Sequence, residues 1–357
     1  MSFIIAVAPD DFSKENATFE KRDSFAVHWL EVFKQEGHKI KYVNVRSEKI
    51  LEDIRNCHAF LWRWKHTGGD AVIAKNLLPV VENVFKLPVF PNQQTCWHYD
   101  NKAAQAYLLQ ALNIPHPRTW LFHDATQALH WATGKAEYPL VLKLSTGAGS
   151  INVIMLNNKQ EAVFWINRMF AEGTFNLSPI NSSQQEIQEN IQRYAQSVVN
   201  TGFPPGPDSY FYDYHKGYIL FQHFLPNNEF DTRVTVIGNR AFCFRRQNRP
   251  QDFRASGSGV ILYEQEAIDP SFIHLAFSAA KKINSQSLAI DGLYDDGEPI
   301  ISEISYTYAA WAVHNCTGHW VLHGEPFEGE LEFVAGHMWP GTAQAIDFLK
   351  ILHSFWS

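Results

Sequence analysis

Residues 288–305 read LAIDGLYDDGEPIISEIS, and this segment carries the strongest information about the architecture. Its apolar runs Leu288–Tyr294 and Pro299–Ile304 are typical of β-strands, and the Asp-Asp-Gly between them indicates a hairpin turn. Such a hairpin brings Asp291 and Glu303, twelve residues apart, to one end of the strand pair. Paired carboxylates and phosphate oxygens together are the usual ligands of Mg²⁺. One Asp and one Glu alone are a weak signal of metal binding. They indicate a metal site only in combination with a phosphate-binding site elsewhere in the chain.

Arginines concentrate just upstream of this hairpin. Residues 231–254 hold six of the 13 arginines against two aspartates, a local charge of +4, whereas residues 291–332 hold nine acids and neither Lys nor Arg. Guanidinium groups without acidic neighbours repel one another unless they share an anion. The alternative is a strand with a charged outer face. The density of arginines favours an anionic ligand near Arg233, Arg246 and Arg254.

Two lysines and a glycine-containing loop provide a candidate phosphate site further upstream. Lys102 begins a predicted helix, and Lys143 lies late in the apolar strand Leu140–Leu144. The loop at residues 145–150, Ser-Thr-Gly-Ala-Gly-Ser, precedes another strand, unlike the strand, loop and helix of a P-loop. An ammonium and backbone N–H groups can surround a phosphate, although a lone lysine is more often a solvated surface charge.

A strand that ends in a polar bend follows at residues 221–229, FQHFLPNNE, and leads into Asp231-Thr232-Arg233. The backbone at such a strand end offers donors and acceptors to the edge of an adenine. The alternative is again an antiparallel strand with a charged outer face.

The order of these features resembles the ATP-grasp superfamily, the fold of glutathione synthetase and D-alanine–D-alanine ligase. The resemblance spans roughly residues 99–305 and implies ATP and Mg²⁺ as cofactors. The resemblance implies that the following residues bind the nucleotide, with Glu229 bound to its ribose: Lys102, Lys143, Ser145, Gly147, Gly149, Gln222, His223, Leu225 and Glu229. The resemblance also implies three catalytic residues near the phosphates and the substrate, namely Arg233, Arg246 and Arg254. The metal ligands that it implies are Asp291, Glu303 and Ser305.

The sequence departs from the resemblance at two serines. Ser305 replaces the asparagine of the usual Glu-x-Asn ending, and Ser256 stands where related ligases often have asparagine. A serine hydroxyl is shorter than an asparagine side chain, so a second Mg²⁺ at Ser305 would be reached through water.

The predicted fold class is α/β (α+β): an ATP-grasp fold preceded by a small parallel α/β domain. In residues 1–95, short apolar strands alternate with helical patterns, as in a parallel sheet. Residues 96–216 would form the small lobe, with a polar insertion near 172–208. Residues 217–357 would form the large lobe with the metal site and a C-terminal tail, which we expect to be irregular until a helix at 343–353.

The resemblance implies an enzyme: an ATP-dependent ligase that activates a carboxylate as an acyl phosphate for attack by an amine. Two alternatives stay open, a small-molecule kinase on the same fold and a non-catalytic nucleotide-binding module. The implied partners are a small-molecule carboxylate and an amine. Residues 315–320 loosely resemble the tail of ATP-grasp proteins of surface-polysaccharide synthesis, which suggests a sugar acid or an amino acid. A homo-oligomeric state is left open.

Composition limits the remaining function classes. A formal charge of -7 argues against a nucleic-acid binder. No apolar run approaches 18 residues, which argues against a membrane partner. The four cysteines lie far apart, and with no signal-peptide pattern this predicts a cytoplasmic protein. His314, His319 and His323 with Cys316 allow a zinc site as an alternative to polar surface residues.

Overall fold

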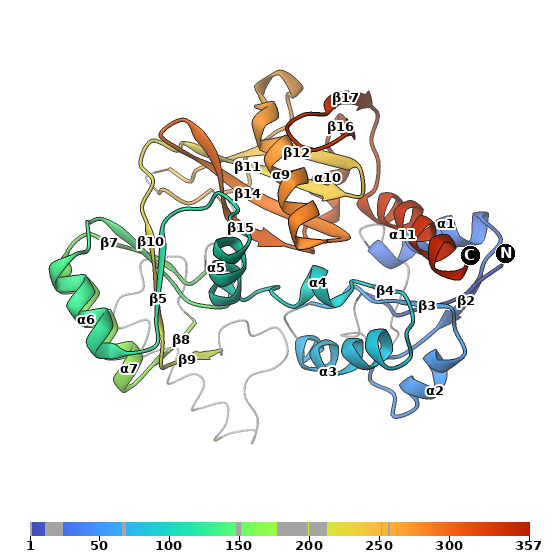
Figure 1. Cartoon of the computed structure of the whole chain (residues 1–357), viewed down its shortest axis with the longest axis horizontal. Coiled ribbons are helices and arrows are strands. Elements are labelled where there is room, and N and C mark those ends of the chain that lie inside the picture. The colour runs from blue at the N-terminus through green and yellow to red at the C-terminus, as the bar shows by residue number, and fades with distance from the viewer. Residues whose placement is uncertain are drawn as a thin grey trace.

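The computed structural model describes residues 2–10, 24–65, 69–147, 151–176, 199, 213–250, 252–255 and 258–357. Gly149, Ser256 and most of the predicted insertion therefore lie outside the described residues. The described strands form three larger sheets and one two-stranded ribbon. Figure 1 shows the N-terminal and second sheets on opposite sides of the molecule, with both termini beside the N-terminal sheet.

The N-terminal sheet is parallel, as the alternation of strands and helices predicted. The N-cap residue Ser24 begins the first described helix by accepting a hydrogen bond from the Val27 N–H, and Gly37, with φ of 78°, follows the end of that helix. The strand order is β2 (Lys39–Tyr42), β1 (Ile4–Val7), β3 (Ala59–Leu61) and β4 (Val89–Phe90). The accompanying helices are α1 (Phe25–Gln35), α2 (Ile50–Arg55) and α3 (Asp70–Asn83).

The second sheet is antiparallel and packs its apolar face against two helices. Its order is β5 (Thr119–Phe122), β10 (Ile219–His223), β6 (Leu140–Lys143) and β7 (Val153–Leu156). The helices are α6 (Ala125–Gly134) and α7 (Lys159–Ala171). Strand β10 lies beyond residue 216, where the sequence placed the end of the small lobe, yet it pairs with both β5 and β6. The ribbon of β8 (Thr174–Phe175) and β9 (Tyr214–His215) adjoins this sheet in Figure 1.

The third sheet is the largest and is antiparallel throughout its described pairs. Its order is β15 (Glu298–Ser305), β14 (Ser287–Asp295), β11 (Phe230–Ile237), β12 (Arg240–Gln247), β16 (Gly318–His323) and β17 (Glu330–Ala335), with β13 (Ile261–Leu262) paired to β12. Helix α9 (Pro270–Ile283) follows the turn Gln265–Ala267 and packs against β11, β14 and β15. Helix α5 (Lys102–Ala111) lies against β15, where the Gln105 side chain donates to the Ile304 carbonyl at 2.8 Å and accepts from its N–H at 3.2 Å.

The C-terminal tail differs from the sequence expectation. It was predicted to be irregular until residue 343, but β16 and β17 pair as a hairpin from Gly318↔Ala335 to His323↔Glu330. A short helix, α10 (Ala310–His314), precedes the hairpin. The prediction was wrong because Gly318–His323 has no alternation of apolar and polar residues, and the alternation in Glu330–Ala335 is limited to its first four residues.

The last helix, α11 (Pro340–Trp356), packs the C-terminal end of the chain against its N-terminal region. It packs against α1, and the Trp29 Nε1 donates to the Gln344 Oε1 at 3.1 Å. One apolar core contains residues from the N-terminal sheet, from β11, β12 and β14 of the third sheet, and from α11. Helix α4 (Gln93–Cys96) leads from the N-terminal sheet to α5. None of the described helices is both long and apolar enough to cross a membrane.

Candidate functional site

A cavity of about 480 Å³ lies between the second and third sheets. The N-terminal sheet reaches the same cavity through Arg63, which follows β3. Ser145 and Glu229 are not among the lining residues, and Gly149 lies outside the described chain. The residues predicted from the sequence that do line it are Lys102, Lys143, Gly147, Gln222, His223, Leu225, Arg233, Arg246, Arg254, Asp291, Glu303 and Ser305.

Strand register places the two predicted metal carboxylates beside each other. Asp291 on β14 is the direct partner of Glu303 on β15 and, on its other side, of Arg233 on β11. A bulge follows at Asp291/Gly292 and leaves Ser302 as the extra residue of β15. The Lys143 Nζ lies 3.5 Å from the Ser302 carbonyl oxygen and thereby contacts the third sheet from the second.

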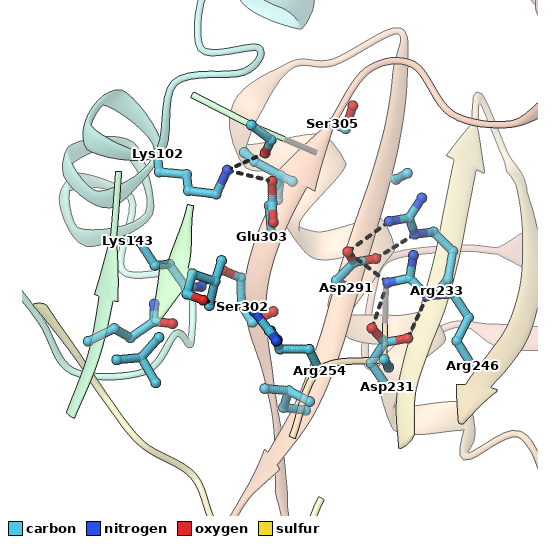
Figure 2. A pocket seen from close by; sticks show the side chains of 18 of the residues that line it. Lys102, Lys143, Asp231, Arg233, Arg246, Arg254, Asp291, Ser302, Glu303 and Ser305 are labelled. Carbon is cyan, nitrogen blue, oxygen red and sulfur yellow. Dashed lines mark hydrogen bonds and ion pairs between the residues drawn. The ribbon is translucent and has the colours of Figure 1, made fainter. Parts of the chain in front are cut away.

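Two aspartates and two arginines form a compact ionic cluster on the third sheet (Figure 2). Arg246 donates through Nε and Nη2 to the Asp231 carboxylate at 2.7 and 2.6 Å, and its Nη2 lies 2.8 Å from the Asp291 Oδ2. Arg233 forms a two-point contact with Asp291, with Nη2 to Oδ2 at 2.7 Å. Both Asp291 oxygens are therefore bonded to guanidinium groups.

The charges in this cluster stabilise one another. Burial alone would raise the pKa of the Asp291 carboxyl, but the Arg233 and Arg246 guanidiniums outweigh it and hold this pKa well below its ordinary value. Burial raises the pKa of Asp231 despite the opposing attraction of Arg246. For Arg246, burial acts to lower the pKa, while Asp291 and Asp231 raise it and dominate. The pair Asp291 and Arg246 is consequently ionised at neutral pH.

The two lysines reach the cavity from different elements. Lys102, at the start of α5, is buried, and its Nζ donates to the Gly147 carbonyl at 2.6 Å and lies 3.5 Å from the Glu303 Oε1. Lys143 is the last residue of β6. Burial lowers the pKa of Lys143 to about 8; nearby Glu303 opposes this shift and Lys102 adds to it. Two ammonium groups therefore lie around one carboxylate that is 35% exposed.

The described start of the glycine-containing loop is fixed by Asp100 and α5. The Asp100 carboxylate accepts from the Gly147 N–H at 2.8 Å, and the Lys102 N–H donates to the Ser145 carbonyl at 2.7 Å. Gly147 has φ of 119°, and a Cβ there would lie 3.0 Å from the Asn152 amide nitrogen. Only glycine fits this backbone without displacing its neighbours.

The end of the cavity beside β10 combines apolar and polar groups. Gln222, His223 and Leu225 line it, and the buried His223 Nδ1 has no hydrogen-bond partner among the described residues. Glu229, predicted to bind ribose, is exposed outside the lining, whereas Asn228 lines it. The Asn228 side chain donates to the Tyr294 carbonyl at 3.0 Å, which fixes it against β14.

Arg254 connects the two sheets that enclose the cavity. Its guanidinium pairs with Asp252, with Nη2 to Oδ2 at 2.7 Å, and its Nη1 donates to the Val153 carbonyl of β7 at 3.0 Å. Arg254 thus approaches β7 across the cavity from the third-sheet side (Figure 2).

Sequence reasoning missed Arg63. Its Nε donates to the Thr307 hydroxyl at 2.5 Å, its Nη2 to the Tyr308 carbonyl at 3.2 Å, and its Nη1 lies 3.8 Å from Asp10. A signal was present: Arg63 follows a buried parallel strand, and ligands of parallel sheets bind beyond the carboxyl ends of the strands. Its meeting with Thr307, 244 residues away, depends on tertiary packing.

Two further predictions of metal binding concern Ser305 and the histidine-containing segment at residues 314–323. Ser305 lines the cavity, but its hydroxyl donates to the Thr307 carbonyl at 2.6 Å and is separate from the carboxylate pair in Figure 2. The zinc alternative has no support: no group of three or more His, Cys, Asp or Glu among the described residues could hold a metal ion. Cys316 lies buried near the Cys243 carbonyl, His323 pairs with Glu332, and His314 stacks on Trp339.

No protein-family model and no curated protein sequence matches the chain. Solved structures match it in fold. D-alanine–D-alanine ligase from Bacillus anthracis is 11% identical with a TM-score of 0.50, over 86% of this chain and 88% of that one. The ATP-grasp ligase PsnB, complexed with a minimal precursor, is 12% identical with a TM-score of 0.51, over 98% and 99%. Biotin carboxylase from Campylobacter jejuni, in a β-γ-ATP complex, is 12% identical with a TM-score of 0.52, over 87% and 67%.

These likenesses, together with the antiparallel sheets that enclose the cavity, show that the chain has the ATP-grasp fold. The fold class and the resemblance predicted from the sequence motifs are confirmed.

Proposed function

We propose that this protein is an ATP- and Mg²⁺-dependent ligase that activates a carboxylate as an acyl phosphate, which an amine then attacks. The observation that carries the proposal is that five cationic side chains and two carboxylates predicted from the sequence line one cavity. The fold that it shares with two solved ligases, D-alanine–D-alanine ligase and PsnB, supports the same reaction class. The cationic side chains are Lys102, Lys143, Arg233, Arg246 and Arg254.

The cationic side chains favour nucleotide phosphates over a neutral ligand as the occupant of the cavity. Lys102 and Lys143 approach from α5 and β6, beside the described start of the loop, while the arginines approach from the third sheet and from the segment after β12. Guanidinium forks bind carboxylate and phosphate oxygens with the same geometry. A γ-phosphate can therefore replace Asp291 or Asp231 on Arg233 and Arg246, and each guanidinium then stays paired with an anion.

The residues fit a magnesium ion that arrives on the nucleotide. Mg²⁺ is commonly held by one or two carboxylates together with phosphates and water. Glu303 would hold it, since its carboxylate lines the cavity and has only Lys102, at 3.5 Å, as a described ionic partner. Asp291 would join only after a phosphate had replaced it on its arginines, and Ser305 is already bonded to Thr307. The chemistry supplied there would be neutralisation of phosphate charge.

The chain's own residues would then position two small substrates. Arg233 and Arg246 would stabilise the charge on the transferred phosphoryl group as the substrate carboxylate oxygen attacks it and ADP leaves. Arg63, at the N-terminal-sheet side of the cavity, would orient an anionic substrate. An amine then attacks the acyl carbon, loses a proton and expels inorganic phosphate. A sugar acid or amino acid as substrate, the cytoplasmic location and the three-part domain division stay predictions.

The test is an ADP-release screen in which carboxylic acids are crossed with amines, in the presence and absence of Mg²⁺. We expect release that needs an acid, with hydroxylamine replacing the amine and trapping the acyl phosphate as a hydroxamate. A phosphorylated alcohol without hydroxamate would identify the kinase alternative. Nucleotide binding without turnover for any pair, and unchanged in Glu303→Gln, would favour the non-catalytic alternative.

A further inference from the structure

A buried polar network lies beneath the described start of the glycine-containing loop. Its central members are Asn152, Asn176 and His215, which are 1%, 2% and 4% exposed. They come from three segments: Asn152 precedes β7, Asn176 follows β8, and His215 ends β9. Pairing of β8 with β9, with Thr174 opposite His215, brings the last two together across 39 residues of sequence.

The network contacts the loop backbone at two successive residues. The Asn152 Nδ2 donates to the Thr146 carbonyl at 2.6 Å and to the Asn176 Oδ1 at 2.6 Å. The Asn176 Oδ1 also lies 2.7 Å from the His215 Nε2. On the other side of the ring, the His215 Nδ1 lies 2.8 Å from the Tyr218 hydroxyl. That hydroxyl in turn accepts from the Ser145 N–H at 2.7 Å.

The directions of these hydrogen bonds are determined by the backbone. The Thr146 carbonyl can only accept, so the Asn152 Nδ2 is the donor, and the Asn176 oxygen accepts from it. The His215 Nε2 must then carry a hydrogen. Because burial lowers the pKa of His215 to about 4, the ring is neutral at pH 7, and its Nδ1 accepts from the Tyr218 hydroxyl.

The loop leaves little room for this network to shift. The position of a Cβ at Gly147 would lie 3.0 Å from the Asn152 Nδ2, so the amide packs directly against the loop backbone. Asp213 adds a bond from outside the network, accepting from the Thr146 hydroxyl at 2.8 Å. The same backbone is also bonded to Lys102, which donates to the Gly147 carbonyl. Residues 145–147 are thus held by hydrogen bonds both from the network and from Lys102, the proposed phosphate-binding lysine.

We propose that Asn152, Asn176 and His215 are positioning residues that set the backbone of residues 145–147 for the phosphates of a nucleotide. The inference rests on the proposed function, because it requires that ATP occupies the cavity. The network contacts the loop and has no described contact with Gln222, His223 or Leu225, the segment proposed for adenine. Its loss should consequently weaken binding of phosphates and leave binding of the base unchanged.

The experiment compares ATP with adenosine as probes, by calorimetric titration of the full-length protein with Mg²⁺ present. In His215→Ala we expect the Kd for ATP to rise about tenfold, because buried partners lose their hydrogen bonds. The Kd for adenosine should stay within about twofold of the wild-type value. His215→Gln keeps one donor and one acceptor and should restore most of the ATP affinity. His130→Ala, an exposed histidine on α6 of the same lobe, is the matched control and should change neither Kd.

Tyr218→Phe keeps the inference testable should His215→Ala not fold, since it deletes only the hydroxyl that binds the Ser145 N–H. It should weaken ATP and spare adenosine in the same way. Equal weakening of both probes would show a merely structural role and overturn the inference, as would unchanged ATP affinity in folded variants. A wild-type protein that binds adenosine and ATP equally, or neither, would instead overturn the proposed function.

Discussion

Lys143 is a half-buried cation with a lowered pKa, so we expect its charge to change within a pH range that a binding assay can reach. With its pKa lowered to about 8, chiefly by burial, about nine-tenths of Lys143 is protonated at pH 7 and about one-tenth at pH 9. If its ammonium binds phosphate, ATP affinity should fall as the pH rises through this range, by up to about tenfold. Titration calorimetry from about pH 7 to about pH 9 measures the change.

The control for this pH dependence is Lys143→Arg, because a guanidinium stays charged over the whole range. The variant should show a flatter profile than the wild type, and any titration of ATP itself cancels between the two. Parallel profiles would mean that the charge of Lys143 does not contribute to ATP binding.

Asp291 and Glu303 are direct strand partners, yet they differ in their ionic contacts and in their exposure. Asp291 is surrounded by Arg233 and Arg246, whereas Glu303 is 35% exposed and contacts only Lys102 among the described ion pairs. Asp291→Asn should lower the free energy of unfolding by about 3 kcal/mol, since two buried guanidiniums lose a partner. Glu303→Gln should change it by less than about 1 kcal/mol while abolishing turnover.

Urea unfolding and the ADP-release assay together check this division. A Glu303→Gln protein as unstable as Asp291→Asn would contradict it, and so would a Glu303→Gln protein with full turnover.

At the scale of elements, Gly292 shows how closely α9 packs on the third sheet. A Cβ at this position would lie 2.4 Å from the Phe272 ring, which is fully buried in the core between α9 and the sheet. Gly292→Ala should therefore lower the free energy of unfolding by about 1 to 3 kcal/mol through overpacking. Gly134→Ala at the end of α6 is the control, because nothing lies within 4 Å of its Cβ position. Thermal melts should separate the two variants; equal melting temperatures would show that Phe272 moves aside freely.

The elements that could be predicted from the sequence were those with clear periodicity or a strong turn. The β14–β15 hairpin follows from two apolar runs around Asp-Asp-Gly, and its register brings Asp291 opposite Glu303 as the spacing suggested. The bulge that points the Ser302 carbonyl toward Lys143 could not be foreseen, because it arises from the pairing of both strands. Helix α7 had a usable signal in the spacing of Ala162, Trp165, Ile166 and Met169, which are its buried residues.

The site itself was predictable to the extent that its chemistry is local. Lys143 interrupts an apolar strand and Arg233 lies in a dense arginine block, and each reaches the cavity. Arg63 and the network at His215 were missed because each depends on partners more than 35 residues away in sequence, which only tertiary packing brings near. The resemblance placed Glu229 on the ribose, but Glu229 lies outside the lining of the cavity, and Asn228 of the same bend lines it.

At the scale of the whole molecule, helix α11 lies in an apolar core that the N-terminal sheet and the third sheet share, so we expect the two sheets to unfold together. Phe348 of α11 is 2% exposed in a core that also contains Ile5 and Trp29 from the N-terminal region and Phe242 from β12. Phe348→Ala should lower the free energy of unfolding by about 3 to 5 kcal/mol through the cavity that it leaves. Because both sheets border that core, amide hydrogens of β1 and β12 should lose protection together.

Phe355 provides the matched control, since it lies in the same helix but is 52% exposed. Phe355→Ala should change stability by less than about 0.5 kcal/mol and leave exchange in both strands as in the wild type. Hydrogen exchange with peptide-level detection shows whether β1 and β12 lose protection together or separately. If Phe348→Ala exposed β1 while β12 kept its full protection, the N-terminal sheet would be an independent domain, and Arg63 would be able to move relative to the arginines and carboxylates of the third sheet. Loss of protection in both strands would mean that α11 holds Arg63 in fixed register with the arginines and carboxylates of the third sheet.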